Sequence, residues 1–211
     1  MTLRALTLAL CTFFASLTQV AAQSTQTALV AGGCFWCVES DFRRVQGVTD
    51  VRVGFAGGTT PSPTYDDVAR GRTDHLEVTE ITFDPGQISY RQILDLFLRS
   101  VDVLDDGGQF CDRGAHYTTA IFATPAQRPT AQAAIQTAEA ELGQPIVTPL
   151  RDMATFYPAD DFHQNYANST ERTLTRFGWV ERRDAYQRYR QACGRDQRVR
   201  ELWGASAAFA K

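Results

Sequence analysis

The chain has 211 residues, a length typical of one domain with an extension. Hydrophobic residues make up 44% and charged residues 21% of the sequence, which is enough apolar mass for a core and excludes an intrinsically disordered chain. The net charge of −3 argues against a dedicated nucleic-acid binder and gives no basic surface for anionic lipid. Of the 21 basic residues only Lys211 is a lysine, so Schiff-base and P-loop chemistry have no internal lysine to use.

Residues 1–22 have the pattern of a secretory signal peptide. Arg4 supplies a short positive region, an apolar stretch runs from there to about Val20, and Val20-Ala21-Ala22 is a small-residue cleavage site. The stretch is too short and too often interrupted by polar residues for the roughly 20 apolar residues of a spanning helix, which disfavours a membrane anchor. We therefore expect cleavage, export to the periplasm or secretion, and a single catalytic domain with a C-terminal extension over residues 23–211.

The first half of this domain alternates strand and helix patterns. A short buried strand is predicted over residues 27–31, followed by a helical stretch that ends at Gly47. Alternating apolar residues predict a strand over residues 48–55, and residues 76–83 are predicted to form the next one. The segment 57–63 between these strands is rich in Gly, Pro, Ser and Thr and is predicted to be a loop.

Two helix starts in the second half are marked by capping boxes. Ser89 is followed three residues later by Gln92, and Thr124 is followed by Gln127, with Pro125 at the first helical position. These pairs predict that helices begin directly after Ser89 and Thr124.

The rest of the chain has weaker signals. Residues 117–122 are predicted to form a strand between the two capped helices, and residues 145–148 are a candidate for one more strand. Beyond Tyr157 the chain is predicted to be helix and loop as far as Cys193, and residues 197–211 have no clear role. The order strand, helix, strand, strand, helix, strand is that of a split βαβ plait. The sequence therefore predicts an α+β fold with helices packed on the sheet, a ferredoxin-like core and an extended C-terminal segment.

The segment Gly33-Cys34-Phe35-Trp36-Cys37 follows a predicted strand and opens a helix. Helix N-termini present unpaired N–H groups and a partial positive charge, so we expect the pKa of Cys34 to fall and its thiolate to act as a nucleophile. Cys37 lies one helical turn further on, about 5–6 Å away at Cβ. With a modest adjustment it can attack an oxidised Cys34 and close a reversible disulfide.

Other interpretations of this C-x-x-C pair stay open at this point. Half of a four-cysteine zinc site normally needs a second C-x-x-C, whereas Cys111 and Cys193 are far apart in the sequence. An exported thioredoxin-like thiol–disulfide oxidoreductase usually has Pro or Gly between its cysteines, in place of Phe35-Trp36. In a secreted binding module the cysteines would serve only as structural disulfides.

Gly-Cys-Phe-Trp followed by Val-Glu resembles the signature of the type A peptide methionine sulfoxide reductases. Further segments resemble that family in the same order: Gly54-Phe55-Ala56-Gly57-Gly58, Pro63-Thr64-Tyr65, His75-Leu76-Glu77-Val78, Asp112-Arg113-Gly114-Ala115-His116-Tyr117 and Phe162-His163-Gln164-Asn165-Tyr166. The resemblance covers about residues 27–168. It implies an enzyme that reduces methionine-S-sulfoxide, free or in proteins, without a metal or an organic cofactor. We expect it to act as a monomer.

The resemblance also implies which residues reduce the sulfoxide. Cys34 would attack the sulfoxide sulfur, and Glu77 would give a proton to the oxygen if burial raises its pKa. On the residues alone, Glu77 could equally be a solvated glutamate. Tyr65 and Tyr117 would donate hydrogen bonds to the oxygen, as an oxyanion hole does.

Further residues would shape the site. Phe35 and Trp36 would form the wall of an apolar pocket for the substrate methyl group. Asp112 would assist resolution of the intermediate or docking of the reductant. Three more residues, Glu39, His163 and Tyr166, would position the helix and the site.

Reduction would leave a sulfenic acid on Cys34, which Cys37 would convert to a disulfide for an external thioredoxin-like dithiol to reduce. Two cysteine wirings remain. In the favoured one Cys34 and Cys37 are the redox pair and Cys111–Cys193 is a structural disulfide beside Asp112. In the other, Cys193 is the resolving cysteine or a relay, because many family members resolve with a cysteine in their tail.

Overall fold

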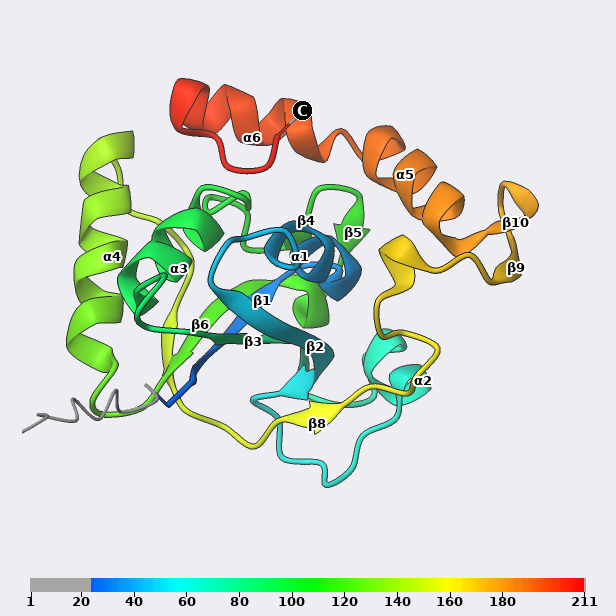
Figure 1. Ribbon diagram of the computed structural model, residues 1–211, viewed down its shortest axis with the longest axis horizontal. Helices are drawn as coiled ribbons and strands as arrows, with labels where there is room; N and C mark the ends of the chain where they lie inside the picture. Colours follow the sequence, from blue (N-terminus) through cyan, green and yellow to red (C-terminus); the bar gives the residue numbers. More distant parts are fainter. Residues whose placement is uncertain (1–23, 211) are drawn as a thin grey trace, which may run out of the picture.

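The structure is a computed structural model that describes residues 24–210, and the predicted signal segment lies outside this range. Its centre is a six-stranded sheet with the strand order β7-β6-β1-β3-β2-β8 (Figure 1). Each of the four central strands is antiparallel to its neighbours among them, and at the edges β7 is parallel to β6 and β8 is antiparallel to β2. The strands are β1 (Gln26–Gly32), β2 (Val48–Ala56), β3 (Leu76–Phe83), β6 (Thr119–Ala123), β7 (Leu150–Asp152) and β8 (Tyr157–Pro158).

Three helices pack against the sheet: α1 (Phe35–Phe42), α3 (Tyr90–Leu98) and α4 (Arg128–Leu142). The predicted order of six elements is present, but the short helix α2 (Tyr65–Ala69) is inserted between β2 and β3, and the two-residue strands β4 (Gly108–Gln109) and β5 (Asp112–Arg113) are inserted between α3 and β6. The capping box at Ser89 is also confirmed, because its hydroxyl accepts from the backbone N–H of Gln92 and its own N–H donates to the Gln92 side chain at 2.9 Å.

Strand β1 shows how the core is divided between the two faces of the sheet. Ala28 and Val30 face a large cluster to which α1, α3 and α4 contribute buried side chains. Leu29 and Ala31 face a smaller cluster, against which Phe156 packs from the segment between β7 and β8. Both faces are therefore covered, and β1 leads into Gly33 and Cys34, which are buried as well.

Two helix boundaries differ from the sequence-based expectations. Helix α1 ends at Phe42, and turns continue the chain to Gly47. Thr124 and Gln127 do exchange the capping hydrogen bonds, at 3.1 and 3.2 Å, but α4 begins only at Arg128. The capped turn leads directly into α4, because the N–H of Arg128 donates to the carbonyl of Thr124 at 3.0 Å, and Pro129 lies in the first turn of the helix, where its missing N–H is tolerated.

The prediction of a strand over residues 145–148 was wrong. The edge strand β7 begins only at Leu150, and before it the N–H of Val147 donates at 2.8 Å to the carbonyl of Val103, outside the sheet. Pro145 and Pro149 have no N–H to donate to a neighbouring strand, which explains why apolar character alone did not make this segment a strand.

The C-terminal segment contains a hairpin that the sequence did not reveal, formed by β9 (Arg172–Thr175) and β10 (Gly178–Glu181). Two helices follow, α5 (Arg182–Ala192) and α6 (Arg195–Trp203), and they run along one side of the molecule in Figure 1. A second small hairpin pairs β4 (Gly108–Gln109) with β5 (Asp112–Arg113). None of the helices in residues 24–210 is long and apolar enough to span a bilayer.

Candidate active site

Cys34 is the N-cap residue of α1, directly after β1, as the sequence predicted. The tight turn before it depends on Gly33, which has a φ of +78°. A Cβ atom at this position would lie 2.5 Å from the Cβ of Gln109, so only glycine fits here. The turn therefore fixes Cys34 at the beginning of the helix.

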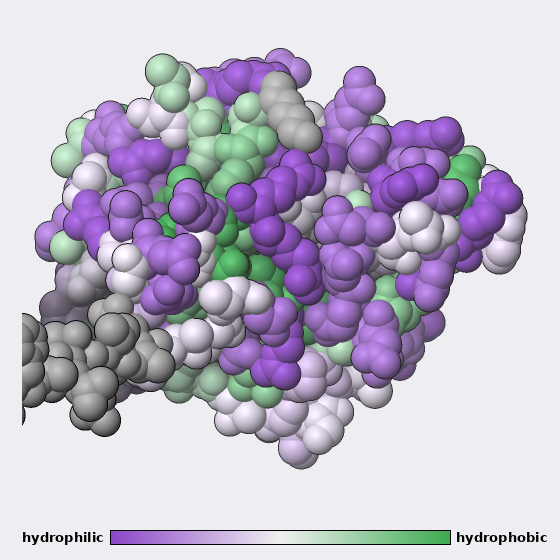
Figure 2. All heavy atoms as spheres, in the orientation of Figure 1, coloured by the Kyte–Doolittle hydropathy of each residue, from purple (hydrophilic) through white to green (hydrophobic). Residues whose placement is uncertain are grey.

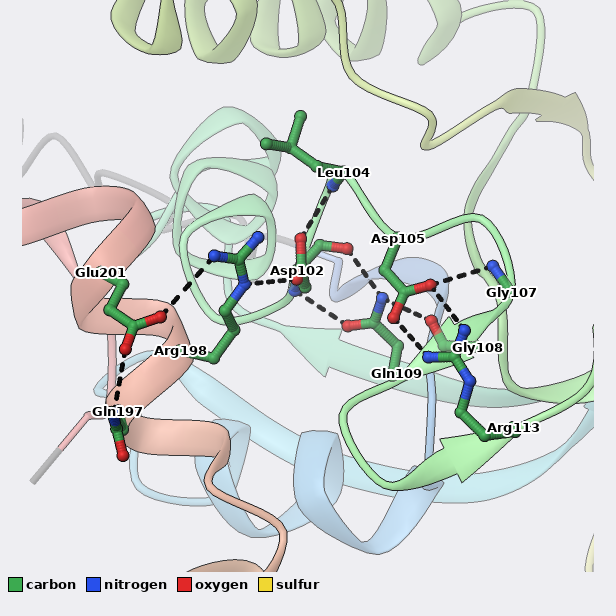
Figure 3. Close-up of polar contacts among 10 residues, drawn as sticks. All are labelled: Asp102, Leu104, Asp105, Gly107, Gly108, Gln109, Arg113, Gln197, Arg198 and Glu201. Carbon is green, nitrogen blue, oxygen red and sulfur yellow. Dashed lines mark hydrogen bonds and ion pairs between the residues drawn. The ribbon is translucent and has the colours of Figure 1, made fainter.

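Gln109 in turn holds the loop that leads to Asp112. Its buried amide accepts from the N–H of Asp102 at 2.9 Å and donates to the Asp102 carbonyl at 2.7 Å (Figure 3). The loop is also tied by Arg113, which forms an ion pair with Asp105 at 2.5 Å. These contacts make the loop a rigid support on one side of Cys34.

Glu77 reaches the same place from β3. Its side chain is 2% exposed, and its Oε2 accepts from the backbone N–H of Phe35 at 3.0 Å. Burial raises the pKa of Glu77 to about 8, against the opposing effect of the Phe35 hydrogen bond and with an added contribution from Asp112. A carboxyl that remains largely protonated at neutral pH can act as a proton donor.

Cys34 and Cys37 are free thiols, 7% and 3% exposed. Their mutual hydrogen bond, with Cys34 as donor, and then burial raise the pKa of Cys34 well above its usual range. The same hydrogen bond lowers the pKa of Cys37, against burial and with support from Arg195 and Arg190.

The prediction that the pKa of Cys34 falls was therefore wrong for this structure, in which both thiols are buried. The nearest helix-terminal N–H, that of Phe35, is occupied by the Glu77 carboxyl. The carboxyls of Glu77 and Asp112 also oppose a negative charge on Cys34. In this state Cys37 is the more readily ionised thiol of the pair.

Aromatic rings surround the start of α1. The ring of Phe35 lies 6.3 Å from that of Tyr65 and 5.5 Å from that of His163. Trp36 stacks on Tyr166 with ring centroids 3.9 Å apart. An apolar groove of about 200 Å³ opens beside Trp36, between this stack and the C-terminal segment.

Tyr65 and Tyr117 remain protonated hydrogen-bond donors in this environment. Burial is the main cause that raises the pKa of each phenol, and the nearby carboxyl of Glu77 is the second. Cys34 contributes to both shifts in the same direction. The structure thus brings both tyrosines into the electrostatic neighbourhood of Cys34 and Glu77.

Buried polar contacts fix the segment that carries His163 and Tyr166. Glu39 on α1 accepts from the N–H of Asn165 at 2.7 Å and from Arg43 at 3.0 Å. Gln164 exchanges hydrogen bonds of 3.0 and 2.9 Å with the backbone of Val53 on β2. These bonds clamp the aromatic segment against α1 and the sheet.

Asp112 lies beside the disulfide between Cys111 and Cys193. Burial raises the pKa of Asp112, while a hydrogen bond from the phenol of Tyr189 opposes this shift. Tyr189 and its neighbour Tyr186 are on α5, and both pack in the cluster that contains the free cysteines. Sequence reasoning missed these two tyrosines, whose spacing of three residues on a helix was the only available signal.

The disulfide also bears on the metal alternative. Because Cys111 and Cys193 are bonded to each other, they cannot supply the second pair of ligands for a zinc site at Cys34 and Cys37. Within residues 24–210 no group of three or more His, Cys, Asp or Glu side chains is arranged to hold a metal ion.

The comparisons with known proteins agree with this geometry. Residues 26–201 match the family model described as peptide methionine sulfoxide reductase. A relative from Rhizobium meliloti, peptide methionine sulfoxide reductase MsrA 2, is 46% identical over 88% of this chain and 87% of its own length. A protein with the same description from Caulobacter vibrioides is 41% identical over 88% of this chain and 89% of its own.

Solved structures show the same relationship. Mxr1 from Saccharomyces cerevisiae in its reduced form has a TM-score of 0.65 at 29% identity and covers 68% of this chain and 84% of its own. Methionine sulfoxide reductase A of Corynebacterium diphtheriae has a TM-score of 0.61 at 30% identity and covers 74% and 84%. Both support the mixed α+β fold built around a central sheet. With the family model matching well over half of its length, the chain belongs to the peptide methionine sulfoxide reductase family.

Proposed function

We propose that this chain is a peptide-methionine (S)-S-oxide reductase that converts methionine-S-sulfoxide, free or in proteins, to methionine. The observation that carries the proposal is the position of Glu77, a buried carboxyl with a pKa near 8, at the first N–H of the helix that Cys34 opens. Membership in the family makes the chain an oxidoreductase of this class. The same membership disfavours the thioredoxin-like alternative.

In the first step the sulfur of Cys34 attacks the sulfoxide sulfur. Glu77 gives a proton to the oxygen, which makes it a better leaving group. Tyr65 and Tyr117 hold that oxygen by hydrogen bonds, while Phe35 and Trp36 bind the apolar part of the methionine side chain. The sulfur–sulfur bond formed by this attack then breaks as the hydroxyl passes to the sulfur of Cys34. Cys34 becomes a sulfenic acid, methionine is released, and the proton lost from the Cys34 thiol replaces the one that Glu77 gave.

In the second step Cys37 attacks the sulfenic acid and water leaves, which yields a disulfide between Cys34 and Cys37. The hydrogen bond between the two thiols and the lowered pKa of Cys37 support this pairing. The Cys111–Cys193 disulfide supports it further, since Cys193 is already engaged. A thioredoxin-like dithiol would then reduce the new disulfide by exchange, and no metal or organic cofactor takes part.

Two wider expectations belong to the same proposal. The central strands run in the order β6-β1-β3-β2, all antiparallel, with α1 and α3 as the crossover helices, and this order favours a ferredoxin-like core. The pattern of residues 1–22 supports export to the periplasm or beyond. A disulfide between Cys111 and Cys193 fits such an oxidising compartment.

The test is the reduction of each methionine sulfoxide epimer with dithiothreitol, comparing the parent with Cys34→Ser. We expect turnover of the S epimer only, and none by the variant. Reduction of an insulin disulfide without any sulfoxide turnover would instead favour the thioredoxin-like alternative.

A further inference from the structure

The C-terminal segment covers the two free cysteines. Cys34 and Cys37 pack in one buried cluster with Tyr186 of α5, and Tyr189 of the same helix packs against its edge. The opposite face of α5 is charged, and the surface around this helix is largely hydrophilic in Figure 2. An amphipathic helix thus lies over the site with its aromatic face inward.

Two links between the same pair of segments hold α5 in this place. The phenol of Tyr189 donates to Asp112, and the neighbouring Cys111 is bonded to Cys193. Cys193 is the C-cap residue of α5, and its N–H donates to the carbonyl of Tyr189 at 3.0 Å, so the two links are one helical turn apart. The disulfide therefore keeps the ring of Tyr189 at the edge of the cysteine cluster.

The accessibility of the disulfide contrasts with that of the free thiols. Cys111 is exposed and Cys193 is partly exposed, whereas Cys34 and Cys37 are buried. Thiol–disulfide exchange needs access to a disulfide sulfur. Because Cys111 is exposed, a dithiol can reach the bond between Cys111 and Cys193 while Cys34 and Cys37 remain buried.

The structure also shows which part of the segment would move. Helix α6 is anchored independently of the disulfide, since Arg198 pairs with Asp102 at 2.7 Å (Figure 3) and Arg195 donates to the carbonyl of Ser100 at 2.9 Å. Gly194, with a φ of +67° and open space at its Cβ position, separates α5 from α6.

Besides the disulfide, ion pairs hold both ends of α5. At its start Arg182 pairs with Glu171 at 2.7 Å, and in its C-terminal half Arg190 pairs with Asp41 of α1 at 2.9 Å and with Asp196 of α6 at 2.7 Å. A groove of about 700 Å³ lies beside the pair of Arg190 with Asp41, lined by both residues and by side chains of α6. Movement of the C-terminal part of α5 about Gly194 therefore requires that the contacts of Arg190 break along with the disulfide.

We propose that the Cys111–Cys193 disulfide is a redox-controlled clasp that holds α5 over Cys34. A dithiol of the thioredoxin class gives two electrons and two protons to the disulfide, which opens to two thiols as the dithiol becomes a disulfide. With the disulfide open, movement of the C-terminal part of α5, which carries Tyr186 and Tyr189, exposes Cys34 to sulfoxides in polypeptides. Only this last step rests on the proposed function. The bond thus has a role beyond that of a structural crosslink.

The test measures the accessibility of Cys34 without using catalysis. Protein whose Cys34 and Cys37 are reduced and whose clasp is intact is treated with iodoacetamide, and the rate of Cys34 alkylation is followed by peptide mass mapping. The double variant Cys111→Ser, Cys193→Ser is treated in the same way. We expect Cys34 of the variant to react at least tenfold faster.

Two further measurements keep the test decisive if the double serine variant misfolds. In the parent, a graded dithiol titration should raise the Cys34 alkylation rate in parallel with the fraction of opened clasp. Tyr189→Phe, which keeps the ring and the disulfide but loses the hydrogen bond, should stay within threefold of the parent.

The outcomes separate this inference from the proposed function. The clasp is overturned if Cys34 is alkylated at rates within twofold of each other in the parent with an intact disulfide, the parent with a reduced disulfide and the double serine variant. This outcome holds whatever the sulfoxide reductase activity of these proteins. Faster alkylation on opening, together with no sulfoxide reduction in any state, upholds the clasp and overturns the proposed function.

Discussion

The carboxyl of Glu77 accepts a hydrogen bond of 3.0 Å from the backbone N–H of Phe35, and so it occupies the helix terminus that Cys34 opens. This one contact explains two properties of the site. It removes the nearest helix N–H from the Cys34 thiolate, and it places a mostly protonated carboxyl near the sulfur that is proposed to react. The proposed acid Glu77 and the proposed nucleophile Cys34 are therefore linked through the backbone of α1.

The first prediction concerns the pH dependence of the reduction step. Since Glu77 must be protonated to act and its pKa is raised to about 8, the single-turnover rate should be lost as the pH rises through 8. Glu77→Gln keeps an acceptor for the Phe35 N–H but has no proton to give, so we expect a loss of about 10²- to 10⁴-fold. Rapid-quench measurement of methionine formation from pH 6 to pH 10 checks both statements. An unchanged pH profile in the variant would contradict the acid role.

A second prediction concerns stability. The pKa of Glu77 is raised on folding, so protonation favours the native state, and the free energy of unfolding should fall as the pH rises from about 4.3, the usual unfolded value, to about 8. Between pH 5 and pH 8 the parent should lose on the order of 3 kcal/mol relative to Glu77→Gln. Urea unfolding of both proteins at the two pH values measures this difference, and parallel curves would refute it.

The sequence predicted those parts of the site that depend on local order. Gly33, Cys34 and Cys37 lie where they were expected because a strand, a tight turn and a helix start are neighbours in the chain. The alternation of apolar residues also predicted β2 and β3, because successive side chains of a strand point to opposite faces of the sheet.

The rest depends on contacts between distant segments. The raised pKa of Cys34 comes from its hydrogen bond to Cys37, from burial and from the carboxyls of Glu77 and Asp112, which no local pattern brings together. The hairpin β9–β10 escaped detection because its strands have only four residues each and carry charged side chains. The packing of Tyr189 against the cluster that contains the free cysteines also depends on the tertiary fold and has no local sequence signal.

A third prediction tests the cysteine wiring. Cys37→Ser should release about one methionine per enzyme molecule in a single turnover and then stop with a sulfenic acid on Cys34, because the attacking thiol is missing. Dimedone labelling of Cys34 with peptide mass mapping detects this species, and Cys34→Ser serves as the unlabelled control. In the parent, mapping after one turnover should give a Cys34–Cys37 disulfide. A Cys34–Cys193 disulfide would instead assign Cys193 as the resolving cysteine.

The last prediction compares a buried with an exposed ion pair. Arg190 joins α5 to α1 through Asp41, and both side chains are largely buried, at 14% and 4% exposure. Arg190→Ala leaves Asp41 buried without its partner, so the free energy of unfolding should fall by about 3–5 kcal/mol. Arg70→Ala removes the exposed pair with Asp66 and should cost less than about 1 kcal/mol. Asp41→Asn in the Arg190→Ala background should restore part of the loss, because it removes the uncompensated charge. Urea unfolding of the four proteins at pH 7 measures these differences, and equal effects of Arg190→Ala and Arg70→Ala would show that the buried pair does not anchor α5.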